Sequence, residues 1–258
     1  MSDKHSEELH QMNPTGRFSD RAADYRVHRP DYPRAAIDAL LAALGDPARL
    51  TAADVGAGTG ISARLLSDRG VRVVAVEPNA EMRAAAGAHA GIQWREGTAE
   101  ATGLAAQSVA LVLCAQAFHW FRAREALEEF HRVLVSRGRL ALMWNARDRS
   151  DPLTLGYVEA IHQVNGEHPV GTRPFDPAVV PAGGRFTPAT LLCFPHQQRL
   201  DRAGLIGRAT SASYVPREGE ALETLIALLG KLWERHRDAS GYVLLRYVTK
   251  LYLSTRLE

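Results

Sequence analysis

Cysteine is scarce in this chain. The two residues present, Cys114 and Cys193, cannot by themselves form a disulfide framework or a zinc site. Free thiols in a reducing compartment are therefore expected. An excess of charge of one sign is also lacking, since 31 Lys and Arg residues stand against 29 Asp and Glu residues, a net charge of +2. This balance excludes a general nucleic-acid or membrane-surface binder.

Long apolar runs and metal-binding motifs are missing as well. No uninterrupted stretch reaches the roughly 20 apolar residues of a membrane helix. Met1–Asn13 is polar and lacks the apolar segment of a signal peptide. We expect a cytoplasmic protein that does not associate with membranes. The ten histidines show neither an H-E-x-x-H motif nor Cys/His ligand spacing, so no metal site is predicted.

Apolar runs alternate with segments of helical periodicity along most of the chain. With 258 residues, 46% of them hydrophobic and 23% charged, the chain suits one large α/β domain, with or without an appended subdomain. The alternation predicts βαβ units and a parallel sheet. Strands are expected at residues 52–55, 71–76, 92–95, 109–114, 140–144 and 190–200, and helices at residues 61–69, 80–89, 123–134, 153–164 and 222–233.

Three features refine this pattern. Gly138 is placed to end the helix that begins at Ala123. Eight of the twenty residues in Gly166–Arg185 are Gly or Pro, which predicts a loop or lid in place of a packed helix or central strand. Val243–Leu253 alternates charged and apolar residues, which suits an antiparallel strand with one partly wet face.

The segment 54–60, DVGAGTG, is a glycine-rich turn between an expected strand and an expected helix. Glycines allow a tight turn and let a ligand approach the backbone closely. The spacing is G-x-G-x-G, because Ile61 stands where a dinucleotide-binding fingerprint has its third glycine. No P-loop Lys-Ser/Thr follows, which disfavours nucleoside triphosphates. The alternative is a tight βα connection with no ligand.

Glu77 ends the next expected strand. A carboxylate at this place can accept hydrogen bonds from both ribose hydroxyls of a nucleoside, and the alternative is a solvent-facing acid that caps a helix. Because open α/β sheets bind ligands at the carboxyl ends of their strands, the glycine turn and Glu77 together favour a nucleoside-containing ligand.

Several stretches together resemble the class I S-adenosylmethionine-dependent methyltransferases, in the small-molecule branch that includes the trans-aconitate and quinone methyltransferases. The resemblance covers roughly residues 17 to 145. The matching stretches are FSDRAADYRVHRPDYP at 18–33, DVGAGTG at 54–60, VEPNAEM at 76–82, GTAE at 97–100 and AQAFHWF at 115–121.

The resemblance implies S-adenosylmethionine as cofactor and a role for each matching residue. Gly56, Gly58 and Gly60 would line its methionine and ribose portions, with Asp54 anchoring the loop near the amino group and Glu77 on the ribose hydroxyls. Further residues are implied in adenine binding, methionine binding or closure: Pro78, Met82, Thr98, Ala99, Glu100, Gln116, Tyr25 and Arg29.

These further roles differ in kind. Pro78 and Met82 would pack against adenine, whose edge the segment 98–100 would meet. Many relatives carry Asp where this chain has Thr98. The hydroxyl of Thr98 can still form a hydrogen bond with adenine, but this bond lacks the contribution of a charged carboxylate. Gln116 would lie beside the methionine tail. Tyr25 and Arg29, four residues apart, would share a helix face and close over the cofactor, with Arg29 meeting the methionine carboxylate; a solvated basic helix is the alternative.

Methyl transfer from a sulfonium is an in-line displacement that needs no metal. The protein must align the reactants, exclude water and, for a hydroxyl or an acidic carbon, supply a base. His119 is the candidate base, and the alternative is a structural histidine packed beside Trp120. Arginines that flank the variable region are candidates for recognising an acidic acceptor, against a solvated surface as the alternative: Arg147, Arg149, Arg173 and Arg185.

The sequence therefore predicts a doubly wound, seven-stranded, mostly parallel sheet with an antiparallel last strand. We expect a flexible N-terminus over 1–16 and a single methyltransferase domain over 17–256, in which an N-terminal helical segment (17–50) and an insertion (146–185) form the acceptor lid. The expected activity is methylation of a small organic acceptor at oxygen, with no nucleic-acid partner. Methylation at carbon or nitrogen, a cofactor-binding protein without transfer activity, and a nucleotide-sugar or NAD enzyme are the alternatives.

Overall fold

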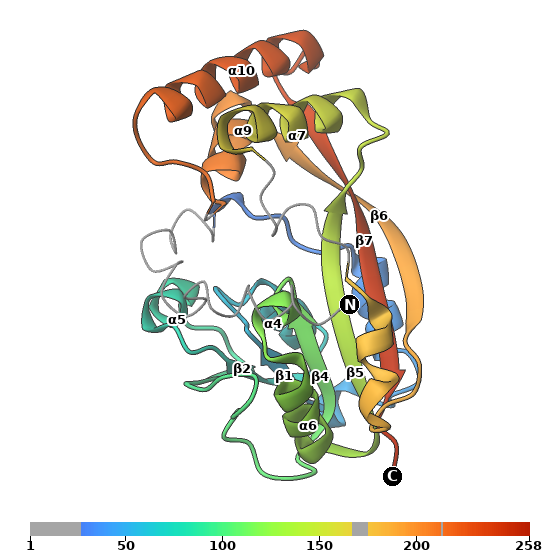
Figure 1. Cartoon of the computed structure of the whole chain (residues 1–258). Helices are drawn as coiled ribbons and strands as arrows, with labels where there is room; N and C mark the ends of the chain where they lie inside the picture. Colours follow the sequence, from blue (N-terminus) through green and yellow to red (C-terminus); the bar gives the residue numbers. More distant parts are fainter. Residues whose placement is uncertain (1–26, 167–174, 213) are drawn as a thin grey trace.

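Seven strands form one mixed sheet in the computed structural model, which describes residues 27–166, 175–212 and 214–258. The strand order is β3-β2-β1-β4-β5-β7-β6, and β7 is antiparallel to both of its neighbours. The strands are β1 (Thr51–Val55), β2 (Arg72–Val76), β3 (Ile92–Arg95), β4 (Val109–Ala115), β5 (Leu134–Arg147), β6 (Thr190–Leu200) and β7 (Val243–Thr255). The doubly wound sheet with an antiparallel last strand is confirmed (Figure 1).

Helices cover both faces of the part of the sheet built from β1 to β4. On one face, α3 and α4 pack Ile37, Leu40 and Leu66 against the strands, and on the other face α6 contributes Leu127 and Phe130. The described helices are α3 (Arg34–Leu41), α4 (Ile61–Ser67), α5 (Ala80–Ala86), α6 (Ala123–Val133), α7 (Pro152–Asn165), α9 (Arg202–Thr210) and α10 (Glu220–His236).

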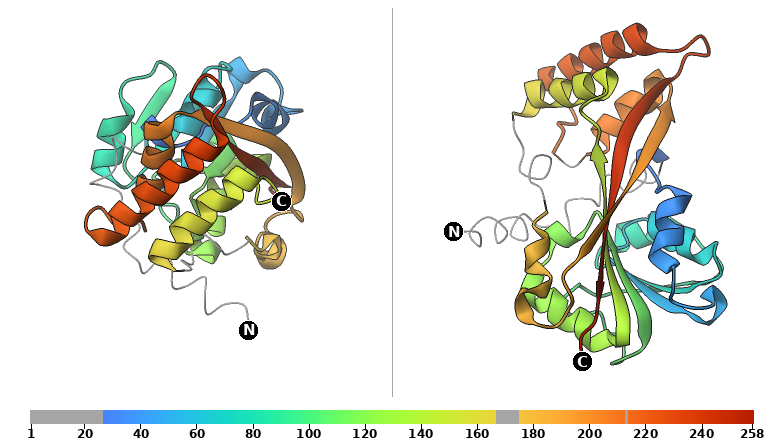
Figure 2. Two further views of the ribbon diagram at one scale, coloured as in Figure 1. Left: turned by 90° about the horizontal axis from the view of Figure 1, so that it is seen from above. Right: turned by 90° about the vertical axis from the view of Figure 1, so that its right-hand side faces the viewer.

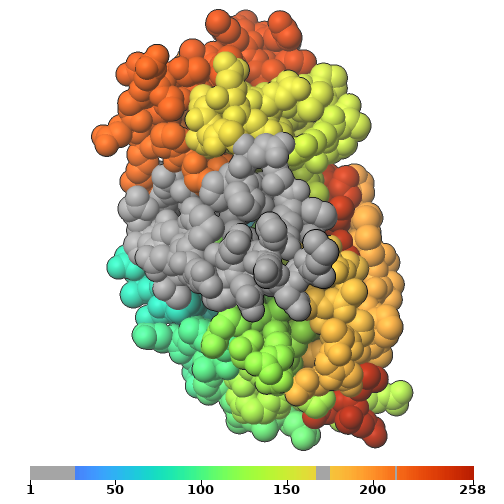
Figure 3. All heavy atoms as spheres, in the orientation of Figure 1, coloured from blue at the N-terminus to red at the C-terminus, as the bar shows by residue number. Residues whose placement is uncertain are grey.

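A third apolar core lies at the far end of the long strands. There α7, α9 and α10 pack on one another and on the ends of β6 and β7, around Tyr157, Leu205 and Tyr247. We call these three helices the cap and the rest of the molecule the body. The cap forms one end of the molecule, and β5, β6 and β7 run from the body into it (Figures 1 and 2). In the space-filling view, atoms of the cap lie at the top and atoms of the body lie below (Figure 3).

Two expectations about this part of the chain need correction or extension. The helix α6 ends at Val133, not near Gly138, because Leu134 already has extended backbone angles and pairs with Val109 in the sheet. Gly138 lies inside β5, at a place where the pairing with β4 shifts register. The strand is also longer than expected and reaches Arg147.

The insertion expected over 146–185 divides between the two parts of the molecule. Its first residues complete β5, α7 belongs to the cap, and the single turns Pro177–Val179 and Pro181–Gly183 lie beside Val180, which packs into the core of the body. The structure adds α9 and α10 to the cap, although their residues lie outside the predicted insertion. The flexible terminus expected over 1–16 lies outside the described residues.

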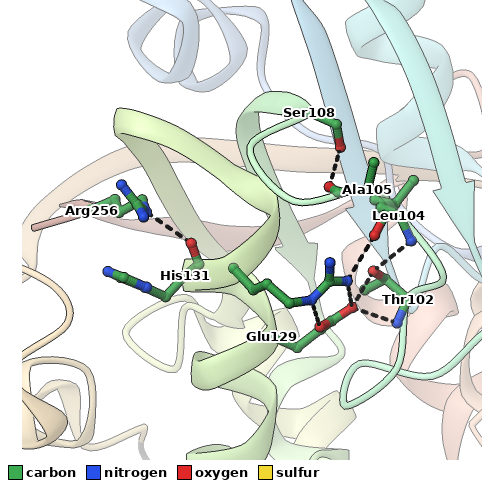
Figure 4. Close-up of polar contacts among 8 residues, drawn as sticks. Thr102, Leu104, Ala105, Ser108, Glu129, His131 and Arg256 are labelled. Atoms are coloured by element: carbon green, nitrogen blue, oxygen red, sulfur yellow. Dashed lines mark hydrogen bonds and ion pairs between the residues drawn. The ribbon is translucent and has the colours of Figure 1, made fainter. Parts of the chain in front are cut away.

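A buried polar network holds the loop between β3 and β4 against α6. The Glu129 carboxylate accepts hydrogen bonds from the backbone N–H (2.9 Å) and hydroxyl (2.5 Å) of Thr102, and Arg132 donates both to Glu129 and to the Leu104 carbonyl (Figure 4). Burial alone would raise the pKa of Glu129, but the hydrogen bonds from Arg132 and Thr102 outweigh burial and lower it. The ionised carboxylate therefore fixes the end of the segment 97–102.

We expect Glu129→Gln to lower the free energy of unfolding by about 1–3 kcal/mol at pH 7, because buried donors lose a charged acceptor. Since the folded pKa is depressed, this stabilisation is present above the ordinary carboxyl pKa and is lost as the pH falls through the folded value. Urea unfolding measures the effect. The neighbouring Glu128→Gln removes only a partly exposed pair with Arg185 and should cost less than about 0.5 kcal/mol; equal losses in the two variants would contradict the assignment.

Candidate functional site

The glycine turn lies at the carboxyl end of β1, between β2 and β4. Gly56, Gly58 and Gly60 all have left-handed backbone angles, with φ of +69°, +56° and +78°. A Cβ on Gly56 would lie 2.6 Å from the Cβ of Ala117, and one on Gly60 would lie 2.9 Å from the Trp94 ring. The turn therefore requires glycine for both conformation and space, and it presents bare backbone.

Asp54, in β1, is a fully buried acid directly before this turn. Its Oδ2 accepts a hydrogen bond from the Ser62 hydroxyl at 2.7 Å, whereas its Oδ1 is buried without a hydrogen-bond partner. Burial raises the pKa of Asp54 to about 7, and the nearby Glu77 adds to the rise. An orphaned buried oxygen of this kind suits a donor or a cation that the described protein itself does not supply.

Glu77 follows β2 and folds its carboxylate onto the glycine turn. Its Oε2 accepts the backbone N–H of Gly58 at 2.8 Å, and its Oε1 accepts that of Asn79 at 3.0 Å. The residue is 8% exposed, and burial raises its pKa although both backbone donors and Arg83 act in the opposite direction. Each carboxylate oxygen keeps a second lone pair, so the group can still accept two hydrogen bonds.

The residues expected at adenine lie on α5 and on the loop after β3. Met82 and Ala99 are buried, and Pro78 is half-buried. Arg83 connects the two segments, since it donates to the carbonyls of Glu77 and Pro78 and pairs with Glu96 at 2.9 Å. The apolar side chains therefore belong to neighbouring segments.

Two further residues of the expected adenine edge differ in exposure. Thr98 is exposed and forms an isolated bridge with Ala101. Glu100 is half-buried, and its Oε1 accepts the backbone N–H of Arg122 at 2.9 Å. One carboxylate oxygen of Glu100 is thus already used to hold the start of α6.

Gln116 has a left-handed backbone at the carboxyl end of β4, with φ of +60°. This conformation is strained for a residue with a side chain, and such strain is concentrated at functional positions. The backbone N–H of Gln116 donates to the Met143 carbonyl of β5 at 2.8 Å, which holds the turn in place. After Gln116 the chain leaves β4 and forms the single helical turn Phe118–Trp120.

His119 lies in the single helical turn Phe118–Trp120, and its ring faces Trp144 of β5. The Trp144 indole N–H donates to His119 Nδ1 at 3.4 Å, so the neutral ring carries its proton on Nε2. Burial lowers the pKa of His119 to about 4, and the charge of Arg29 adds to this effect. The imidazole is therefore uncharged at neutral pH.

The remaining expected residues are distributed more widely. Tyr25 and Arg173 lie outside the described residues. Arg29 donates to the Ser211 carbonyl of the cap at 3.3 Å, Arg149 is exposed, and Arg185 pairs with Glu128 at 3.0 Å. Of the three arginines named for an acidic acceptor that the structure describes, Arg147 alone contacts the interior of the cap, where its guanidinium lies over the Tyr157 ring.

Sequence reasoning missed Arg208. This residue lies on α9 and is 5% exposed, and it shares the buried face of the helix with Leu205 and Ala209. No helix was expected over residues 202–210, so there was no signal in the sequence that this arginine lies on a buried face. No helix of the described segments is long and apolar enough to cross a membrane, and these segments contain no cluster of metal-ligating side chains.

Comparison with known proteins agrees with this geometry. Residues 53–142 match the family model of the methyltransferase domain. That segment includes β1 to β4, the glycine turn, Glu77 and His119. This segment is similar to a methyltransferase domain, and the seven-stranded sheet around it matches the fold of solved methyltransferase structures.

Individual relatives support the same classification. The chain is 41% identical over 153 residues to an uncharacterised methyltransferase of Mycobacterium tuberculosis, covering 58% of each chain. It is 38% identical over 137 residues to one from Schizosaccharomyces pombe, covering 52% of this chain and 55% of the relative. The match therefore spans little more than half the length of these curated relatives.

Solved structures extend the similarity to most of the fold. A protein from Anaeromyxobacter dehalogenans, assigned as a type II methyltransferase, superposes with a TM-score of 0.62 at 26% identity, over 88% of this chain and 97% of the other. A protein from Anabaena variabilis, assigned as a methyltransferase of an antibiotic biosynthesis pathway, gives a TM-score of 0.62 at 21% identity, over 89% and 99%. The second likeness concerns the fold alone.

Asp54 should make the stability of the ligand-free protein depend on pH. Because its folded pKa is raised from 3.8 to about 7, ionisation costs stability as the pH rises through this interval. Asp54→Asn removes that cost while keeping an oxygen for Ser62. Relative to wild type, the variant should gain about 2–4 kcal/mol between pH 4 and pH 8 in urea unfolding.

The matched control is Asp46→Asn, at a position where the side chain is 61% exposed. Because water solvates an exposed carboxylate, this variant should not show the gain expected for Asp54→Asn. If Asp54→Asn also differs from wild type by a constant amount, Asp54 does not titrate in this interval and the assignment is wrong.

Proposed function

We propose that this chain transfers a methyl group from S-adenosylmethionine to a small organic acceptor, at oxygen. The observation that carries the proposal is the buried Glu77 carboxylate folded onto a bare glycine turn at the carboxyl ends of adjacent strands, within a methyltransferase domain. Both the turn and the carboxylate offer unused hydrogen-bonding capacity where an open α/β sheet binds its ligand.

The residues present fit the cofactor. The two free lone pairs of Glu77 suit the two ribose hydroxyls, and the glycine turn leaves room for the methionine and ribose portions. The orphaned Oδ1 of Asp54 suits the positively charged amino group or a water bound to it. When bound, the cofactor supplies an electrophilic methyl group on a positively charged sulfur. The acceptor would attack this methyl group from the side opposite the sulfur, and the sulfur would leave with the bonding electrons.

The other assignments rest on family likeness together with position. Met82, Ala99 and Pro78 offer apolar surface for adenine. Thr98 and Glu100, which flank Ala99 in the chain, are proposed at the edge of the adenine ring. Gln116 is proposed beside the methionine tail. Tyr25 and Arg29 are proposed to close over the cofactor, as parts of a lid made of residues 17–50 and 146–185.

His119 is proposed as the group that receives the acceptor's proton on Nδ1, the nitrogen with the lone pair, where the acceptor's hydroxyl would replace the Trp144 indole N–H. Its pKa of about 4 leaves it uncharged at neutral pH, but also makes it a weak base. A weak base suits an acceptor whose hydroxyl is itself acidic, and an acceptor that is already ionised needs only alignment and exclusion of water. Transfer to carbon or nitrogen, and a binding protein without transfer activity, are the alternatives.

Glu77→Gln should weaken the binding of S-adenosylhomocysteine by about 10- to 100-fold in calorimetry, because a buried charged acceptor becomes neutral. The control is Glu96→Gln, whose side chain is 77% exposed and also pairs with the neighbouring Arg83. This control should bind as wild type does. Undiminished affinity in Glu77→Gln would remove the residue from the ribose role.

His119→Ala should lower turnover by about 10²- to 10⁴-fold, the usual contribution of a general base, without weakening S-adenosylhomocysteine binding. The measurement is transfer of a labelled methyl group to a metabolite extract, with the product identified by mass. His236→Ala, at the end of α10, serves as control. Normal turnover in His119→Ala would dismiss the base, and label that never leaves the cofactor would favour the binding protein.

A further inference from the structure

Two guanidinium groups, one buried and one half-buried, lie where β5 enters the cap, and no carboxylate of the described segments pairs with either. Arg147 ends β5, and Arg208 lies on the buried face of α9. No Asp or Glu of the described segments comes within ion-pair distance of either group, and each is held by tyrosines. Burying two like charges without a counter-charge is costly, so this arrangement calls for an explanation.

Tyrosine hydroxyls and rings surround the pair. Arg147 donates to the Tyr214 hydroxyl at 3.3 Å, and its guanidinium carbon lies 5.0 Å from the centre of the Tyr157 ring. Arg208 donates through Nε to the Tyr247 hydroxyl at 3.2 Å. Arg147 and Tyr247 are directly opposed in the β5–β7 ladder, so both side chains lie on the same face of the sheet.

Hydrogen-bonding capacity in this cluster is left unused. The Nη1 of Arg208 and the hydroxyl of Tyr157 are both buried and have no hydrogen-bond partner. Arg208 is 5% exposed and Tyr157 is not exposed at all, so bulk water does not satisfy them. Donors that are buried, unsatisfied and positively charged define a site for an anion.

The cluster lies next to the proposed reaction centre. Trp144, whose indole contacts His119, precedes Arg147 by three residues on β5, which is about 10 Å along a strand. Arg29 donates to the carbonyl of Ser211, three residues after Arg208, and its charge lowers the pKa of His119 and also that of Tyr214, the partner of Arg147. Because residues three apart on a strand point to opposite faces, Trp144 does not join the two places directly, and Arg29 is the residue that connects the cluster with the surroundings of His119.

We propose that Arg147 and Arg208, with the Tyr157 hydroxyl, bind an oxyanion group of the methyl acceptor, a carboxylate or a phosphate. This rests on the proposed function, since it assigns the acceptor its class: a small acid anchored through one anionic group while another atom is methylated. Guanidinium groups suit this role because their planar donors match both oxyanions in pairs.

Calorimetry on the full chain, with S-adenosylhomocysteine in excess, tests the site directly. The probes are succinate, inorganic phosphate and the uncharged succinamide. We expect saturable binding of at least one of the two anions and none of succinamide. Arg208→Met and Arg147→Met should each weaken anion binding at least tenfold, while Arg202→Met, an exposed position on the same helix, should leave it unchanged.

Binding of succinate alone would indicate a carboxylate acceptor, and binding of phosphate alone a phosphorylated one. Absence of binding by both anions, or equal affinity in wild type and both Met variants, would overturn the proposal. So would a tyrosinate absorbance at neutral pH that is lost in Tyr214→Phe, because a phenolate would then be the internal counter-charge. Arg208→Lys, which keeps the charge, covers the case in which Arg208→Met does not fold.

The outcome is separable from that of the proposed function. S-adenosylhomocysteine affinity should be the same in Arg208→Met and in wild type, because the residue lies in the cap. Anion binding without any cofactor binding would support the anion site and reject the methyltransferase proposal. Cofactor binding without anion binding would reject the anion site and leave the methyltransferase proposal supported.

Discussion

The hydrogen bond from the Gly58 backbone N–H to the Glu77 carboxylate, 2.8 Å long, is the contact on which the site depends. It joins the turn after β1 to the end of β2, two segments that the sheet only brings near each other. Ala117, after β4, approaches Gly56 so closely that no side chain fits there. The ends of three strands thus determine one stretch of bare backbone, and the carboxylate is buried because the turn folds over it.

Buried charge is distributed unevenly between the two parts of the molecule. The body holds the buried acids Asp54 and Glu77 beside the glycine turn, and the cap holds the buried cation Arg208, with Arg147 at its border. In an interior of low polarity each group favours a ligand of opposite sign. Under the proposed function, a positively charged cofactor and a negatively charged acceptor would therefore be drawn to opposite sides of the same centre.

The parts of the fold that the sequence predicted well are those governed by local pattern. The strand over 190–200 was located to the residue, and it begins soon after the segment rich in Gly and Pro and ends directly before Asp201. Gly138 was assigned wrongly, since a glycine after a helical segment has the same local signature whether it ends a helix or lies in a shifted strand pairing. For the candidate site, the motifs located Glu77 and the glycines, but the left-handed backbone of Gln116 depends on a bond to β5. The buried position of Arg208 was not predicted, because the residues around it come from β7 and β5, which are distant from it in the sequence.

The strands β5 and β7 pass through the body and the cap without interruption. A lid on a hinge can swing, but a cap that grows from the same two strands as the active-site sheet is fixed at its base. Its helices α7, α9 and α10 follow the ends of these strands in the chain, and Arg29 of the N-terminal segment adds a hydrogen bond to the Ser211 carbonyl. Such a framework lets the helices be exchanged in evolution for others that recognise a different acceptor, while the glycine turn and its carboxylate stay as they are.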